Sequence, residues 1–213
     1  MAAGVARPRG GWYDDLAPCG RGGRGVGCER RRRSGGRAGG AMGTPRQVIA
    51  PEVIAARVAE LGKRIGADYA GRELVLVGML KGAAVLLADL LRAIPGNVRF
   101  ELVNVTHQVE PRGAIIELTY ATHVHLEGAH ALILKDICHS GVTENYLLTH
   151  LAQQGPASIE VAALVNRPLL RRVALEPKYV VLEGVPEGRL AGYGIELEGR
   201  WGNLPGINVL EGV

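Results

Sequence analysis

The stretch from Ala131 to Ala152 places the strongest constraint on the fold of this chain. Its first four residues, Ala-Leu-Ile-Leu, are typical of a buried strand, and the acidic residue Asp136 follows shortly after them. A short loop carrying Gly141 comes next, and the pattern from Val142 onward predicts a helix up to Ala152. Unpaired N–H groups and the positive end of a helix dipole converge at such a junction. The stretch therefore predicts an anion-binding site.

The side chains around this junction narrow the expected ligand. Ser140 and Thr143 add hydroxyl groups to the loop, and the Asp136 carboxylate at the strand end suits ribose hydroxyls or a magnesium-bound phosphate. A phosphorylated sugar combines all of these groups. Lys135 and His139 are unusual residues for such a loop, so they mark the positions where its chemistry is altered.

Length and cysteine content bound the remaining possibilities. A chain of 213 residues with 47% apolar residues can form one domain with a substantial core. The three cysteines give no disulfide framework and favour a reducing, cytoplasmic location. No apolar run is long enough to span a membrane. Cys138 beside the loop has two interpretations: a thiol activated by the helix N-terminus, or, as we favour, a small residue facing the core.

The charge of the chain is concentrated at its N-terminus. Residues 1–44 hold nine arginines and three acids, a net charge of +6, which leaves −2 for residues 45–213. Thirteen of the 31 glycines also lie in this segment, which predicts a disordered tail before a globular domain at 45–213. The tail is either a basic arm that touches nucleic acid or anionic lipid, or a segment without a role before a start at Met42. The globular part itself has no nucleic-acid footprint.

The order of the remaining elements predicts an α/β fold. Alternating strands and helices favour a mostly parallel sheet, which binds ligands at the carboxyl ends of its strands. In the last third of the chain, the glycines and prolines between short apolar runs predict short elements in an irregular cap. The expected elements are a helix from Pro51 through Ile65, a strand over 74–80, a helix over 83–94, a strand over 98–105, a loop over 107–113, and strands over 114–124, 159–165, 179–182, 190–193 and 207–210.

Three segments in this order give the chain a resemblance to a known family. They are residues 74–82 with 88–94, residues 131–143, and residues 192–196 with 203–205. Together they resemble the hypoxanthine-guanine phosphoribosyltransferases over roughly residues 50 to 213. The resemblance implies a type I phosphoribosyltransferase fold, with a mostly parallel central sheet flanked by helices and a small irregular C-terminal hood.

The resemblance also implies an activity and partners. The family transfers phosphoribosyl from phosphoribosyl pyrophosphate to a purine base in purine salvage, releases pyrophosphate and uses Mg²⁺. It also forms dimers or tetramers. Lys81 and Gly82 match its pyrophosphate loop, in which the Leu80–Lys81 peptide is cis. Ser140, Gly141 and Thr143 match its 5′-phosphate cradle, and Asp136 matches a carboxylate that holds the ribose hydroxyls.

Other matched positions depart from the family. His139 stands in place of the aspartate that acts as general base, and an imidazole can also accept a proton near neutral pH. Lys135 stands in place of a first ribose acid, which reverses the charge. The remaining departures are Asn166 for the lysine that reads the purine oxygen, Arg189 with Leu190 at the stacking aromatic, Glu196 for a metal-binding aspartate, Gly202 for a pyrophosphate-binding arginine, and Val105–Thr106 for a serine-tyrosine pair.

These departures leave two principal hypotheses for function. The first is a divergent purine phosphoribosyltransferase, with activity that is reduced or shifted toward another base. The second is a catalytically inactive relative that binds a nucleoside monophosphate or sugar phosphate as a sensor or partner subunit. A purely structural partner of an active enzyme is a third.

Overall fold

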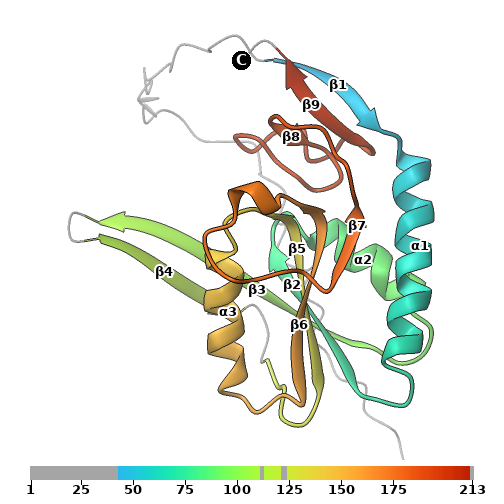
Figure 1. Cartoon of the computed structure of the whole chain (residues 1–213), viewed down its shortest axis with the longest axis vertical. Coiled ribbons are helices and arrows are strands. Elements are labelled where there is room, and N and C mark those ends of the chain that lie inside the picture. The colour runs from blue at the N-terminus through green and yellow to red at the C-terminus, as the bar shows by residue number, and fades with distance from the viewer. Residues whose placement is uncertain (1–42, 111–112, 121–123, 212–213) are drawn as a thin grey trace, which may run out of the picture. The chain divides into compact units, whose positions relative to one another are not determined.

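The computed structural model describes residues 43–110, 113–120 and 124–211, so the predictions for residues 1–42 lie outside the described range. Figure 1 shows the elements in chain order. They are β1 (Thr44–Ile49), α1 (Pro51–Asp68), β2 (Leu74–Leu80), α2 (Ala84–Ala93), β3 (Arg99–Glu110), β4 (Gly113–Tyr120), β5 (His130–Cys138), α3 (Val142–Ala152), β6 (Ser158–Asn166), the 3₁₀ helix η1 (Pro168–Leu170), β7 (Tyr179–Leu182), β8 (Leu190–Ala191) and β9 (Ile207–Glu211).

A mostly parallel sheet forms the centre of the fold, as the sequence predicts. Among the described residues, six strands pair in the order β4-β3-β2-β5-β6-β7. All neighbouring pairs are parallel except β3 with β4, which is antiparallel at one edge. Parallel neighbours place the carboxyl ends of β2, β5 and β6 at the same edge of the sheet, where ligands bind in α/β folds.

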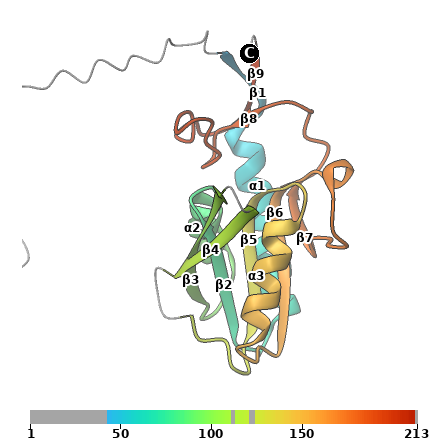
Figure 2. The ribbon, with the colours of Figure 1, turned by 90° about the vertical axis from the view of Figure 1, so that its left-hand side faces the viewer.

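The period of two along each strand divides the core between the two faces of the sheet. Leu76 and Leu134 pack with Ile65 and other residues of α1 and α2 on one face. Their neighbours in the chain, such as Ile133, pack with Leu147 and other residues of α3 on the opposite face. Figure 2 shows α3 in front of the sheet and α1 behind it. Because both faces are covered, the central strands are apolar along most of their length.

Some predicted boundaries are wrong. Residues 107–110 continue β3 rather than forming a loop. β4 is described over Gly113–Tyr120, and residues 121–123 of the predicted strand lie outside the described range. The hairpin of β3 and β4 extends well beyond the rest of the sheet (Figure 1). The strand predicted over 131–134 runs from His130 to Cys138, so Asp136 lies within β5 and not beyond its end.

A second, smaller sheet forms the hood. In the described part of the chain, it has the order β1-β9-β8 with antiparallel pairs, so the predicted C-terminal hood also contains an N-terminal strand that the sequence analysis missed. β8 covers only two of the four residues predicted. The hydroxyl of Tyr193 donates a hydrogen bond to Asp89 of α2, which holds the hood segment against the main sheet's helical layer. None of the described helices is long and apolar enough to cross a membrane.

Candidate phosphoribosyl-binding site

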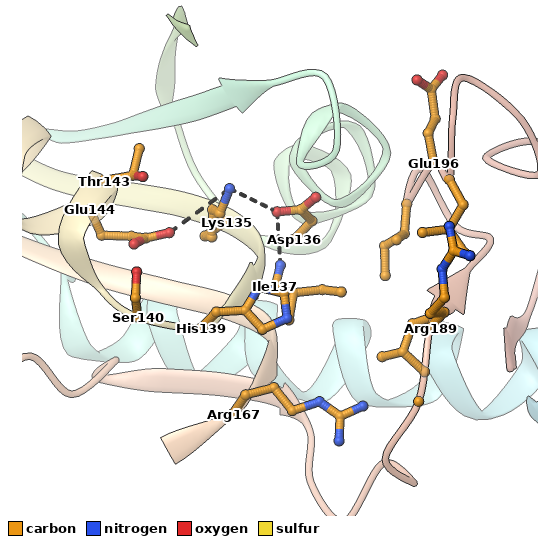
Figure 3. A pocket seen from close by; sticks show the side chains of 14 residues that line it. Lys135, Asp136, Ile137, His139, Ser140, Thr143, Glu144, Arg167, Arg189 and Glu196 are labelled. Carbon is orange, nitrogen blue, oxygen red and sulfur yellow. Dashed lines mark hydrogen bonds and ion pairs between the residues drawn. The ribbon is translucent and has the colours of Figure 1, made fainter. Parts of the chain in front are cut away.

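A cavity of about 420 Å³ lies between the β5–α3 junction and the hood segment 188–197. Seven residues predicted for the site line it, namely Asp136, His139, Ser140, Thr143, Arg189, Leu190 and Glu196. Figure 3 shows Asp136 and His139 on one side of the cavity, with Glu196 and Arg189 across from them. The fold therefore joins the predicted anion loop and the predicted C-terminal residues around one space.

The anion loop begins where β5 ends and α3 begins. Gly141 is the N-cap residue of α3 with a φ of 76°, and an added Cβ there would lie 2.9 Å from a methyl group of Val173. A glycine is therefore required for both conformation and space. Ser140 holds the loop through its backbone, since its carbonyl accepts a hydrogen bond of 2.9 Å from the amide of Arg172. Gly141 itself does not line the cavity, but it sets the turn that brings Ser140 and Thr143 to it.

Arg171 supports the same loop through contacts with its first residues. Its guanidinium donates to the carbonyl of His139 at 2.8 Å and contacts Sγ of Cys138 at 2.8 Å. Cys138 is fully buried, and burial raises the pKa of its thiol. The second interpretation of Cys138, a small residue facing the core, therefore fits the structure.

Asp136 is held by two donors. Its Oδ1 accepts a hydrogen bond of 2.8 Å from the amide of Ile137, and the ammonium group of Lys135 lies 3.1 Å from the same oxygen. Lys135 also lies 3.9 Å from Oε1 of Glu144, whose side chain is only 3% exposed. Lys135 thus stands between two carboxylates (Figure 3). Sequence reasoning missed Glu144, although an acid in the first turn of a helix that follows an anion loop is a usable signal.

His139 faces the cavity, and its surroundings lower the pKa of its imidazole. Burial lowers its pKa below the ordinary 6.5, and the positive charges of Lys135 and Arg167 act in the same direction, while Asp136 partly opposes them. A neutral imidazole presents a nitrogen that accepts a proton. The surroundings of His139 therefore suit a base.

Lys81 and Gly82 lie beside the cavity rather than in its lining. The Leu80–Lys81 peptide is cis, as the resemblance implies. Nζ of Lys81 lies 3.6 Å from Oε2 of Glu196. A Cβ added at Gly82 would lie 1.9 Å from Oδ2 of Asp136. This turn is therefore in direct contact with Asp136.

The predicted purine-reading residue Asn166 does not line the cavity. Its amide oxygen accepts a hydrogen bond from Arg171, and its amide nitrogen lies 3.5 Å from Glu176. Its neighbour Arg167 lines the cavity instead, and Arg167 donates to the carbonyls of Val185 and Pro186 at 3.2 and 2.7 Å. Sequence reasoning missed Arg167, although a charged residue directly after an apolar strand, at the carboxyl edge of the sheet, is a usable signal.

Arg189 and Leu190 occupy the hood side. Arg189 lies 3.3 Å from Glu198, and Leu190 is buried in β8. A Cβ at Gly202 would lie 2.9 Å from Cγ of Glu196, so a longer side chain at 202 does not fit beside Glu196 in this arrangement.

The acidic groups of the cavity are few and spread out. No group of three or more His, Cys, Asp or Glu side chains that could hold a metal ion occurs among the described residues. Asp136 and Glu196 lie on opposite sides of the cavity, and each has a lysine ammonium beside it. They fit Mg²⁺ only where the phosphate oxygens of a ligand supply most of its coordination, which is the usual arrangement for this ion.

A helix-start anion loop facing a small hood defines the phosphoribosyltransferase class, and residues 48–191 match the family described as phosphoribosyl transferase domain. The hypoxanthine-guanine phosphoribosyltransferase of Mycobacterium avium is 31% identical over 172 residues, which cover 77% of this chain and 84% of that protein. The chain therefore belongs to the hypoxanthine-guanine phosphoribosyltransferase family.

Further relatives agree with this membership. The hypoxanthine-guanine phosphoribosyltransferase of Streptococcus pneumoniae is 28% identical over 166 residues, which cover 77% of this chain and 92% of that protein. A crystal structure of a hypoxanthine-guanine phosphoribosyltransferase from Bacillus anthracis, with a HEPES molecule in its active site, superposes with a TM-score of 0.73 at 29% identity. It covers 79% of this chain and 98% of that one.

Proposed function

We propose that this chain transfers the phosphoribosyl group of phosphoribosyl pyrophosphate to a purine base, with release of pyrophosphate, in purine salvage. The observation that carries the proposal is one cavity lined by the anion loop, by Asp136 and by His139, whose pKa is lowered by burial. Membership in the hypoxanthine-guanine phosphoribosyltransferase family supports the same reaction.

The sugar-phosphate half of the substrate is assigned to the sheet side of the cavity. In this proposal, Ser140, Gly141 and Thr143 bind the 5′-phosphate with backbone and hydroxyl donors at the start of α3. Asp136 accepts hydrogen bonds from the ribose hydroxyls. Lys81 and Gly82 bind the pyrophosphate. Gly82 lies beside the ribose-binding Asp136, and the ammonium group of Lys81 lies beside Glu196.

The purine is assigned to the space between His139 and the hood. His139 accepts the proton from the attacking ring nitrogen, which keeps the base nucleophilic as the bond to the sugar forms. Arg189 stacks on the base through its planar guanidinium, with Leu190 beneath it. Asn166 contacts the exocyclic group only after its bond to Arg171 rearranges.

Mg²⁺ completes the proposal as the cofactor of the transfer step. Glu196 would hold it from the hood side, and the ion would neutralise charge on the leaving pyrophosphate. We also propose that the protein works in the cytoplasm, in keeping with its few cysteines, and forms a dimer or tetramer. Light scattering of the purified chain measures the oligomeric state.

The test of this activity is pyrophosphate release from phosphoribosyl pyrophosphate and Mg²⁺ with a panel of nucleobases. We expect turnover with hypoxanthine or guanine, and formation of the matching nucleoside monophosphate by mass spectrometry. The absence of turnover above background with every base contradicts the proposal.

A second candidate function is nucleotide binding without turnover. Two observations favour it: Lys135 pairs with the ribose carboxylate of Asp136, and Gly202 stands where the family has an arginine. This candidate predicts calorimetric binding of guanosine or inosine monophosphate together with no release of pyrophosphate. Turnover with any purine base excludes it.

A further inference from the structure

Lys135 holds a central position in the charge pattern of the cavity. It lies in β5, its side chain is 25% exposed, and its ammonium group lies 3.1 Å from Asp136 and 3.9 Å from Glu144. Figure 3 shows these contacts on the side of the cavity that carries the anion loop. The side chain is thus held by two acids and faces the space where a ligand would lie.

Glu144 explains why this lysine keeps its place. The Glu144 side chain is nearly fully buried, and a buried carboxylate without a positive partner is strongly destabilising. Lys135 supplies that partner from the neighbouring strand. The pair therefore keeps the ammonium group of Lys135 beside Asp136 in the absence of any ligand.

The cavity lining has no surplus of negative charge. Its described lining holds Lys135, Arg167 and Arg189 against Asp136, Glu144 and Glu196. Beside it, Lys81 is a further positive charge next to Glu196. A divalent cation gains most from a group of unpaired carboxylates, and the described residues hold no such group.

We propose that Lys135 serves as the built-in cation beside Asp136, so that phosphoribosyl pyrophosphate binds to this cavity without a divalent metal ion. The inference rests on the proposed function, because it takes phosphoribosyl pyrophosphate as the ligand. It separates two requirements: the ammonium group supports binding of the sugar, whereas Mg²⁺ acts only when pyrophosphate leaves. Dependence on Mg²⁺ then belongs to turnover and not to affinity.

The experiment is calorimetric titration of the full chain with phosphoribosyl pyrophosphate, once in EDTA and once in Mg²⁺. For the natural sequence we expect the two Kd values to agree within about threefold. Inosine monophosphate is titrated in parallel. Binding of phosphoribosyl pyrophosphate only in Mg²⁺ overturns the inference while the proposed function stands. If neither ligand binds in either buffer, the proposed function fails together with the inference.

A charge-reversed variant tests Lys135 directly. Lys135→Glu alone would place an acid beside the buried Glu144 and remove its positive partner, so it is combined with Glu144→Gln to keep the protein folded. We expect this double variant to bind phosphoribosyl pyrophosphate at least about tenfold more weakly in EDTA, and to recover in Mg²⁺. The matched control is Lys63→Glu on the exposed face of α1, which is expected to behave like the natural sequence.

A metal-only readout keeps the test independent of the sugar ligand. Mn²⁺ alone is titrated by electron paramagnetic resonance against the natural sequence and the double variant. We expect binding to become at least about tenfold tighter in the variant, since it gains an acid next to Asp136. Equal Mn²⁺ affinities for the two proteins contradict the role of Lys135 as the resident cation.

Discussion

The contact between Gly82 and Asp136 makes Gly82→Ala the most informative single substitution. A Cβ at position 82 would lie 1.9 Å from Oδ2, 2.4 Å from Cγ and 2.9 Å from Cβ of Asp136. Rotation of the Asp136 side chain about its Cα–Cβ bond moves Oδ2 and Cγ and so relieves the first two contacts. It does not relieve the third, because the Cβ of Asp136 is fixed to β5. The new methyl group therefore has to push either the 81–82 turn or the strand.

The cost has two parts. Overpacking of a tightly packed position costs about 1–3 kcal/mol, and loss of a hydrogen bond to a charged group costs about 1.5–3 kcal/mol. The second part applies because a displaced Asp136 loses its bonds to the amide of Ile137 and to Lys135. We expect Gly82→Ala to lower the free energy of unfolding by about 2.5–6 kcal/mol, the sum of the two parts.

Urea unfolding followed by circular dichroism measures this cost, and calorimetry measures the affinity for phosphoribosyl pyrophosphate. The control is Gly128→Ala, where an added Cβ meets no atom within 4 Å but the backbone has a φ of 70°. That variant is expected to lose only about 1–2 kcal/mol of stability and no affinity. Unchanged stability and affinity in Gly82→Ala would refute the contact between this turn and Asp136.

Three further perturbations test other contacts. Arg171→Ala should lower the free energy of unfolding by about 1.5–3 kcal/mol and weaken binding of phosphoribosyl pyrophosphate, measured by urea unfolding and calorimetry, because the anion loop loses its support. His139 accepts a proton only when neutral and burial lowers its pKa, so the midpoint of the acid-side fall in kcat/KM should lie below pH 6.5; a midpoint above this value contradicts its role. Tyr193→Phe removes the bond to Asp89 and should lower thermal stability by about 1–2 kcal/mol in calorimetric unfolding, while Tyr146→Phe at an exposed position should not.

The sequence predicts the parts of this fold that depend on local pattern. The continuous apolar run of β2 and the helical period of α1 are each explained by burial within one element, so both were found. β1 was missed because its partner β9 lies more than 150 residues away, and the pairing becomes visible only in three dimensions. Residues 107–110 were predicted as a loop because an edge hairpin can keep polar residues in a regular ladder.

In the candidate site, too, local features could be predicted from the sequence, whereas contacts between distant segments could not. The anion loop is a local motif, and its residues were found because a glycine turn and a helix start are both readable in sequence. The contact between Gly82 and Asp136 joins the turn after β2 to a residue of β5, so the motif match indicated a shared role but not that the two residues touch. Asn166 was assigned to the base by position alone. Its amide is bonded to Arg171, while the neighbouring Arg167 reaches the cavity.

Lys135 illustrates why a departure from a family pattern needs a structure for its interpretation. In the sequence, a lysine in place of an acid suggests loss of a function, because its partner is nine residues away and on another element. In the fold, Glu144 is buried beside that lysine, and each charge depends on the other to offset the cost of leaving water. The Lys135–Glu144 pair places a positive charge of the protein beside Asp136, and this arrangement is the basis of our proposal that the cavity has a built-in cation.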